Sequence, residues 1–206
     1  LESQLNKCLI IGEDLGVVPA DFRKAITDAK IFTNKVFYFE KVGHGTFKAP
    51  ENYDSHALAM VNNHDVPTLV SWWNGSDLQL RDELNLLEEG VDCRQLRKER
   101  RQDKANLMDQ LYHSGLYPES WHGRELEEAA DEALIDAILV FVAKTSSKIF
   151  MVQLEDLLMM DSPVNVPGTF HEHANWQRKL SKNTSEIFSG QRVSALLRRI
   201  DQQRKY

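Results

Sequence analysis

Residues 8–16 read Cys8-Leu9-Ile10-Ile11-Gly12-Glu13-Asp14-Leu15-Gly16. Four apolar residues, a glycine and two acidic residues are typical of a fully buried parallel strand whose C-terminal end carries carboxylates. In sheets built from βα units, ligands bind beyond the carboxyl ends of the strands. Glu13 is therefore a candidate catalytic residue. The alternative is that these acidic residues form a turn or cap the next helix.

Two further apolar segments end in polar, ionisable residues. The segment 55–61 runs directly into Asn62-Asn63-His64-Asp65, and the segment 148–156 ends in Glu155-Asp156. A segment rich in aromatic residues at 35–40 predicts another strand. Strands separated by helical segments are typical of an α/β protein with a parallel sheet, here of at most four strands. Acid groups at several strand ends indicate a site at one edge of that sheet.

The segments between these strands have helical or loop patterns. Apolar spacing predicts a one-faced surface helix near 17–26, a charged helix over 95–111, an apolar helix over 125–144 and a final helix from residue 185. The charges of 95–111 are most simply explained by solvation. The loop 41–50, which contains Gly43-His44-Gly45, is expected to move. The proline-containing stretch 162–169 is expected to shape a pocket, and the alternative is a plain chain reversal.

Composition narrows the classes of partner. The 206 residues carry a formal net charge of −6, with 42% hydrophobic and 27% charged residues. With this net charge the chain lacks the basic surface that nucleic acid or an anionic membrane requires, so neither is an expected partner. The longest apolar run, 133–143, is too short to span a bilayer. Two cysteines indicate neither a disulfide framework nor a metal site, so we expect a cytoplasmic protein without a cofactor.

Four separated motifs occur in order: Ile11-Gly12-Glu13-Asp14-Leu15-Gly16, Asn63-His64-Asp65, Gln153-Leu154-Glu155-Asp156-Leu157-Leu158, and Asn165-Val166-Pro167-Gly168-Thr169 with Asn175-Trp176. Together they resemble the C-terminal portion of the 4-alpha-glucanotransferases, the amylomaltase or disproportionating-enzyme family (glycoside hydrolase family 77). The resemblance covers nearly the whole chain and is weakest over 77–147. It implies the C-terminal half of a (β/α)8 TIM barrel, strands 5 to 8, with a C-terminal helix. Residues 1–206 would form a single fragment of the catalytic domain with a helical insertion at about 77–147.

The resemblance also implies a reaction. These enzymes transfer a segment of an alpha-1,4-glucan to a glucose or maltooligosaccharide acceptor by a retaining double displacement. Glu13 corresponds to the general acid/base, Asp65 to the carboxylate that stabilises the transition state, and His64 to its sugar-binding neighbour. Asn165 and Gly168 are further candidates for substrate binding.

Other motif residues are expected to have supporting roles. Asp14 is expected to support the turn or the helix cap, and the counterparts of Glu155 and Asp156 suggest a structural or rim role. Aromatic side chains can stack on glucose rings, but core packing is the favoured interpretation for the three candidates, Trp72, Trp73 and Trp176.

The family's nucleophile lies in an Arg-Ile-Asp-His-type motif at the end of the fourth strand, and no such motif precedes Glu13. Arg199-Ile200-Asp201 lies in a predicted terminal helix without the following histidine. We therefore interpret the chain as the second half of the enzyme, inactive alone, with the missing N-terminal half as its partner. An alternative is a non-catalytic fragment that binds alpha-glucans. A metal hydrolase using Glu13, His64 and Asp65 is poorly supported, because the spacing is not that of a zinc site.

Overall fold

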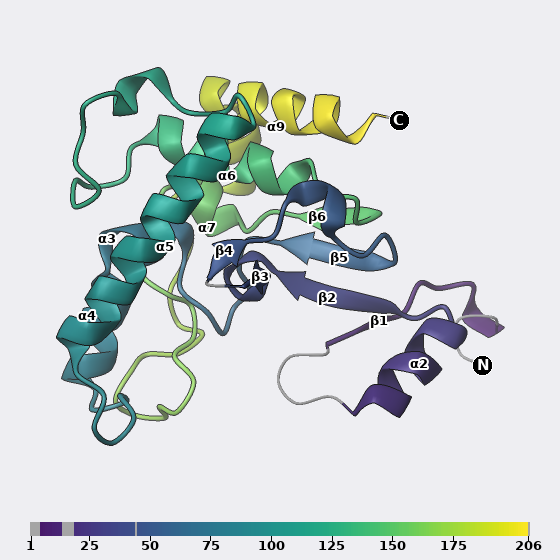
Figure 1. The fold of residues 1–206 in the computed structure, drawn as a ribbon, viewed down its shortest axis with the longest axis horizontal. Helices are drawn as coiled ribbons and strands as arrows, with labels where there is room; N and C mark the ends of the chain where they lie inside the picture. Colours follow the sequence, from purple (N-terminus) through teal and green to yellow (C-terminus); the bar gives the residue numbers. More distant parts are fainter. Residues whose placement is uncertain (1–4, 14–18, 44, 206) are drawn as a thin grey trace.

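The computed structural model describes residues 5–13, 19–43 and 45–205 (Figure 1). A parallel sheet has the strand order β1-β2-β5-β6, which is also the order of these strands in the chain: β1 Ile11–Gly12, β2 Phe32–Val36, β5 Ala57–Met60 and β6 Ile149–Met151. Val36 lies opposite Met60, and Met60 lies opposite Met151. The predicted α/β fold with a parallel sheet is thereby confirmed.

The helices are α2 Ala20–Asp28, α3 Leu69–Asn74, α4 Ser76–Glu83, α5 Cys93–His113, α6 Glu132–Ala143, α7 Leu154–Leu157, α8 Thr184–Ser189 and α9 Gln191–Arg204. Short 3-10 turns occupy Phe37–Phe39, Pro50–Asn52 and Glu119–Trp121. In Figure 1, α3, α4 and α5 lie on the left, away from β1 and α2 on the right. None of the helices in the described ranges is long and apolar enough to cross a lipid bilayer.

The core forms around β5 and α6. All four residues of β5 are buried, because the strand is central in the sheet. Ten of the twelve residues of α6 are buried, and this helix contacts both β5 and α9. Asp131 caps α6 by accepting a hydrogen bond from the Leu134 amide over 2.9 Å. This cap explains why the helix begins at Glu132 and not at residue 125 as predicted.

Two of the predicted strands differ from the structure. The strand predicted at 35–40 ends at Val36, where the chain enters a 3-10 turn that buries Phe37 and Tyr38. The strand predicted at 148–156 ends at Met151, and Glu155 and Asp156 lie in the first turn of α7. The predicted loop at 41–50 contains an antiparallel hairpin, with β3 at Lys41–Val42 and β4 at Thr46–Phe47.

The prediction of a fully buried strand at residues 8–11 is wrong. The side chains of Leu9 and Ile11 are 55% and 39% exposed. Among the described strands, β1 lies at the edge of the sheet and pairs with β2 alone, and its apolar residues are less covered than those of the central strand β5. The roles predicted for Asp14-Leu15-Gly16 and His44 lie outside the described residues.

Candidate functional site

The connection between β5 and α3 carries the Asn63-His64-Asp65 motif. Asn63 is buried, and its Oδ1 accepts a hydrogen bond from the Asp65 amide over 2.9 Å. Its Nδ2 donates to Oε1 of Glu13 over 3.5 Å. The Glu13 side chain is exposed at the end of β1. The structure therefore brings Glu13 and the Asp65 loop together through Asn63, which is the convergence of strand ends that the sequence predicted.

One buried carboxylate holds both ends of this connection. Asp156 accepts a hydrogen bond from Asn62 Nδ2 and another from the Leu69 amide, each over 2.8 Å. Asn62 follows β5, and Leu69 begins α3. Burial raises the pKa of Asp156 from 3.8 to about 6, and the two hydrogen bonds oppose that rise. Its interior position fits the structural role expected for it.

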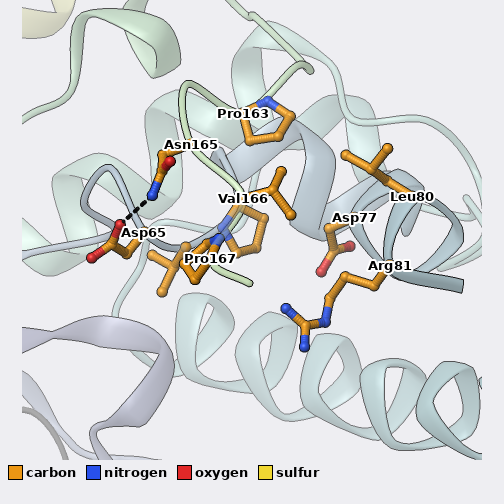
Figure 2. Close-up of a pocket in the computed structure, with 10 residues that line it drawn as sticks. Asp65, Asp77, Leu80, Arg81, Pro163, Asn165, Val166 and Pro167 are labelled. Atoms are coloured by element: carbon orange, nitrogen blue, oxygen red, sulfur yellow. Dashed lines mark hydrogen bonds between the residues drawn. The ribbon is translucent and has the colours of Figure 1, made fainter. Parts of the chain in front are cut away.

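Asp65 is itself fixed by two partners. Asn165 Nδ2 donates to Asp65 Oδ1 over 2.7 Å, and His64 Nε2 lies 3.3 Å from Asp65 Oδ2. Figure 2 shows Asp65 and Asn165 at one end of a depression, with Asp77 and Arg81 at the other end. The rest of the lining is apolar and is formed by Val66, Pro67, Leu80, Pro163, Val166 and Pro167. A few polar groups at the ends of an apolar wall are typical of a ligand site.

The loop that supplies Asn165 is well fixed. Asn175 Oδ1 accepts from the Val166 amide over 2.9 Å, and Asn175 Nδ2 donates to Thr169 Oγ1 over 2.8 Å. Arg178 Nη2 donates to Glu155 Oε1 over 3.1 Å, which ties the loop to α7. These contacts hold Asn165 against Asp65.

Gly168 is placed by its backbone conformation. Its φ is +91°, and a Cβ added there would lie 3.2 Å from Cδ2 of Leu86. A residue other than glycine would be strained at this φ and crowded by Leu86. The structure thus gives Gly168 a role in the turn, and its contact with substrate stays a prediction.

The tryptophans divide into two groups. Trp72 and Trp73 are buried, which confirms core packing for both. Core packing is wrong for Trp176, because its side chain is 62% exposed. The Trp176 ring centroid lies 5.1 Å from that of His64.

Two residues that hold the site together, Asn63 and Arg178, could not be singled out from the sequence. Asn63 bridges the two strand ends, and the available signal was its position directly after a buried strand. Arg178 anchors the loop through Glu155, and an arginine two residues after Trp176 gave no comparable signal. Within the described ranges, no group of three or more His, Cys, Asp or Glu side chains is arranged to hold a metal ion.

Two solved structures are similar to this chain. Amylomaltase from Corynebacterium glutamicum superposes with a TM-score of 0.83 at 23% identity, over 99% of this chain and 30% of that one. Amylomaltase from Streptococcus agalactiae in complex with acarbose superposes with a TM-score of 0.63 at 19% identity, over 99% of this chain and 33% of that one. At these identities the similarity establishes a shared fold.

Sequence comparison goes further. The family profile described as 4-alpha-glucanotransferase matches residues 1–184. The 4-alpha-glucanotransferase of Haemophilus influenzae is 35% identical over 204 residues, which cover 99% of this chain and 29% of the relative. That of Mycobacterium tuberculosis is 26% identical over 206 residues, covering 95% and 27%. The chain thus spans less than a third of the length of these curated relatives. On this evidence, the chain belongs to the 4-alpha-glucanotransferase family.

Proposed function

We propose that this chain supplies the acid/base and the transition-state carboxylate of a 4-alpha-glucanotransferase. The reaction moves a segment of an alpha-1,4-glucan to glucose or a maltooligosaccharide by a retaining double displacement. The observation that carries this proposal is the Asn63 bridge, which joins Glu13 at the end of β1 to the Asp65 loop at the end of β5. Both carboxylates follow strands of one parallel sheet, β1 and β5, with β2 between them. Their convergence supports the roles of acid/base and transition-state stabiliser, and the nucleophile of the retaining pair is a third group.

The two carboxylates have different surroundings and different proposed roles. Glu13 is exposed, so it can reach the glycosidic oxygen, protonate it, and later accept the proton of the acceptor hydroxyl. Asp65 lies between Asn165 and His64, which fix its position. There its negative charge offsets the positive charge that develops on the sugar ring. His64 and Asn165 are assigned to sugar hydroxyls beside it, and Gly168 to the adjoining turn.

The proposed context is strands 5 to 8 of a (β/α)8 barrel, formed by residues 1–206 as one fragment of the catalytic domain with a helical insertion at about 77–147. The parallel sheet, with strands in chain order, supports this arrangement. Double displacement also requires a carboxylate nucleophile, and the family's nucleophile motif is not matched within the 206 residues. We therefore assign the nucleophile to the N-terminal half of the enzyme and expect the isolated polypeptide to be inactive.

The test uses a hybrid enzyme in which residues 1–206 replace the matching segment of the Haemophilus influenzae relative. Disproportionation of maltotriose is expected in the hybrid and not in the isolated polypeptide. Asp65→Asn in the hybrid should lower the rate by about a hundredfold, because the negative charge is lost in the transition state. Full activity in this variant would overturn the proposed role of Asp65.

Asp109→Asn is the matched control. Asp109 forms a similar Asp-His pair, with its Oδ1 3.4 Å from His113 Nδ1, but it lies on the exposed face of α5. The same change there should leave the rate unaltered. Robust glucose release by the isolated polypeptide would overturn the assignment of the nucleophile to the other half.

A further inference from the structure

Trp176 has an unusual backbone conformation. Its φ is +62°, a left-handed value that bulky side chains rarely adopt. The chain is held there because the Trp176 amide donates to the Val164 carbonyl over 2.9 Å. The residues on either side are fixed as well, Asn175 by Val166 and Arg178 by Glu155. Strain of this kind persists only where surrounding contacts enforce it, and it is concentrated at functional sites.

The strained residue is also solvent-exposed. The Trp176 side chain is 62% exposed, although an indole of this size is normally among the more buried groups. The ring is tilted by 46° to the His64 ring at 5.1 Å between centroids. His64 in turn lies 3.3 Å from Asp65. The loop therefore presents a large apolar face directly beside the proposed sugar-binding groups.

The surroundings of the ring are polar. His64 and Arg178 line a small depression together with Asn62, Asn63, Glu155 and Val164. Trp176 adjoins it through its ring contact with His64 and its backbone bond to Val164. Glucose has equatorial hydroxyls around its edge and two faces of C–H groups. A flat indole with carboxylate, amide and imidazole groups around it matches both parts of such a ring.

We propose that Trp176 is a stacking platform for one glucose unit of a bound alpha-glucan, next to the unit that His64 and Asp65 contact. This inference rests on the proposed function and adds a binding residue to it. The indole takes no part in proton transfer. Its loss should therefore weaken glucan binding and, in the hybrid enzyme, raise KM for maltooligosaccharides while leaving kcat nearly unchanged.

The first measurement is calorimetric titration of the 206-residue polypeptide with maltoheptaose. Trp176→Gly removes the ring and places a glycine where φ is positive, so the melting temperature should be unchanged or higher. The affinity should fall by about tenfold, the scale expected when a contact of this area is lost. Trp176→Phe keeps an aromatic face and should retain most of the affinity. Phe170→Ala is the control, since Phe170 is 79% exposed on the same loop.

The second measurement needs no variant. Trp72, Trp73 and Trp121 are buried, so iodide should quench mainly the fluorescence of Trp176. Maltoheptaose is expected to lower the quenching constant by covering the indole. Binding without this protection, or full affinity in Trp176→Gly, would overturn the platform and leave the proposed function intact. Absence of any binding by the wild-type polypeptide would also overturn the platform, while the maltotriose assay of the hybrid decides the proposed function separately.

Discussion

Asn63 donates a hydrogen bond to Glu13, from Nδ2 to Oε1 over 3.5 Å, across 50 positions of sequence. The same side chain accepts the Asp65 amide through its Oδ1. One buried carboxamide thus contacts the Glu13 carboxylate and the backbone of Asp65. Its amide nitrogen bonds Glu13, after β1, and its oxygen bonds the Asp65 amide, after β5. A carboxylate in its place has no hydrogen-bond donor for Glu13.

Asn63→Asp is therefore expected to impair the hybrid enzyme. The substitution preserves shape but places a second carboxylate against Glu13, which disfavours the ionised form of Glu13 that must accept the proton of the acceptor hydroxyl. Transfer from maltotriose should fall by about tenfold or more. Asn106→Asp is the control, because Asn106 bonds the Gly45 carbonyl away from the two carboxylates. A normal rate in Asn63→Asp would show that the bridge has no catalytic importance.

Asp156 should make stability depend on pH. Its pKa is about 6 in the folded protein against 3.8 ordinarily, so the folded chain holds this proton more tightly than the unfolded chain. The contribution of Asp156 to stability is then greatest below pH 3.8 and is lost as the pH rises through 6. The total change is roughly 3 kcal/mol.

Urea unfolding of the wild type and of Asp156→Asn at several pH values measures this effect. The free energy of unfolding of the wild type minus that of the variant should decrease between pH 3.8 and 6 and then level off. A difference that stays constant over this window would contradict a buried, titrating Asp156.

The Asp77–Arg100 pair should contribute strongly to stability. Arg100 donates to both carboxylate oxygens of Asp77, over 2.9 and 2.8 Å, and its guanidinium lies 4.8 Å from the Trp72 ring centroid. Arg100→Ala leaves the largely buried Asp77 carboxylate without its partner, which costs about 3 kcal/mol. Arg101→Ala is the control, because Arg101 pairs with Glu127 in solvent and its loss should change little. Equal effects of the two substitutions on urea unfolding would show that burial of the pair is unimportant.

Gly168→Ala separates backbone strain from crowding. The substitution places a side chain at φ +91° and against Leu86, and it should lower the free energy of unfolding by about 2 kcal/mol. Gly123→Ala is matched, since its φ is +79° with no atom near the added Cβ, and about 1 kcal/mol is expected. Thermal unfolding measures both. If both substitutions lower the free energy of unfolding equally, crowding against Leu86 has no effect on stability.

The sequence was most informative where local pattern and burial agree. The apolar run of β5 and the charged periodicity of α5 predict their elements correctly, because both signals depend on residues within the segment. The order of strands and the polar strand ends then predict that Glu13 and Asp65 approach one another. That prediction needed only the parallel arrangement of the sheet.

Prediction from the sequence failed where burial or backbone conformation depends on residues that are distant in the chain. Leu9 and Ile11 look like core residues, but β1 lies at the edge of the described sheet. Trp176 looks like a core tryptophan, but Val164 and the flanking contacts hold its backbone in a left-handed conformation. Neither effect leaves a periodic signal in the chain.

The most direct test of the account is chemical rescue of Glu13→Ala in the hybrid enzyme. A glycosyl fluoride donor needs no protonated leaving group, so the covalent intermediate still forms without the acid. Breakdown of this intermediate normally needs a base to deprotonate the acceptor hydroxyl. Azide needs no deprotonation, so it can attack the intermediate instead. The account predicts that azide accelerates turnover of an alpha-maltosyl fluoride and yields a glycosyl azide with the configuration of the donor. Wild-type transfer from maltotriose by Glu13→Ala, or no azide product, would contradict the assignment of Glu13 as the acid/base.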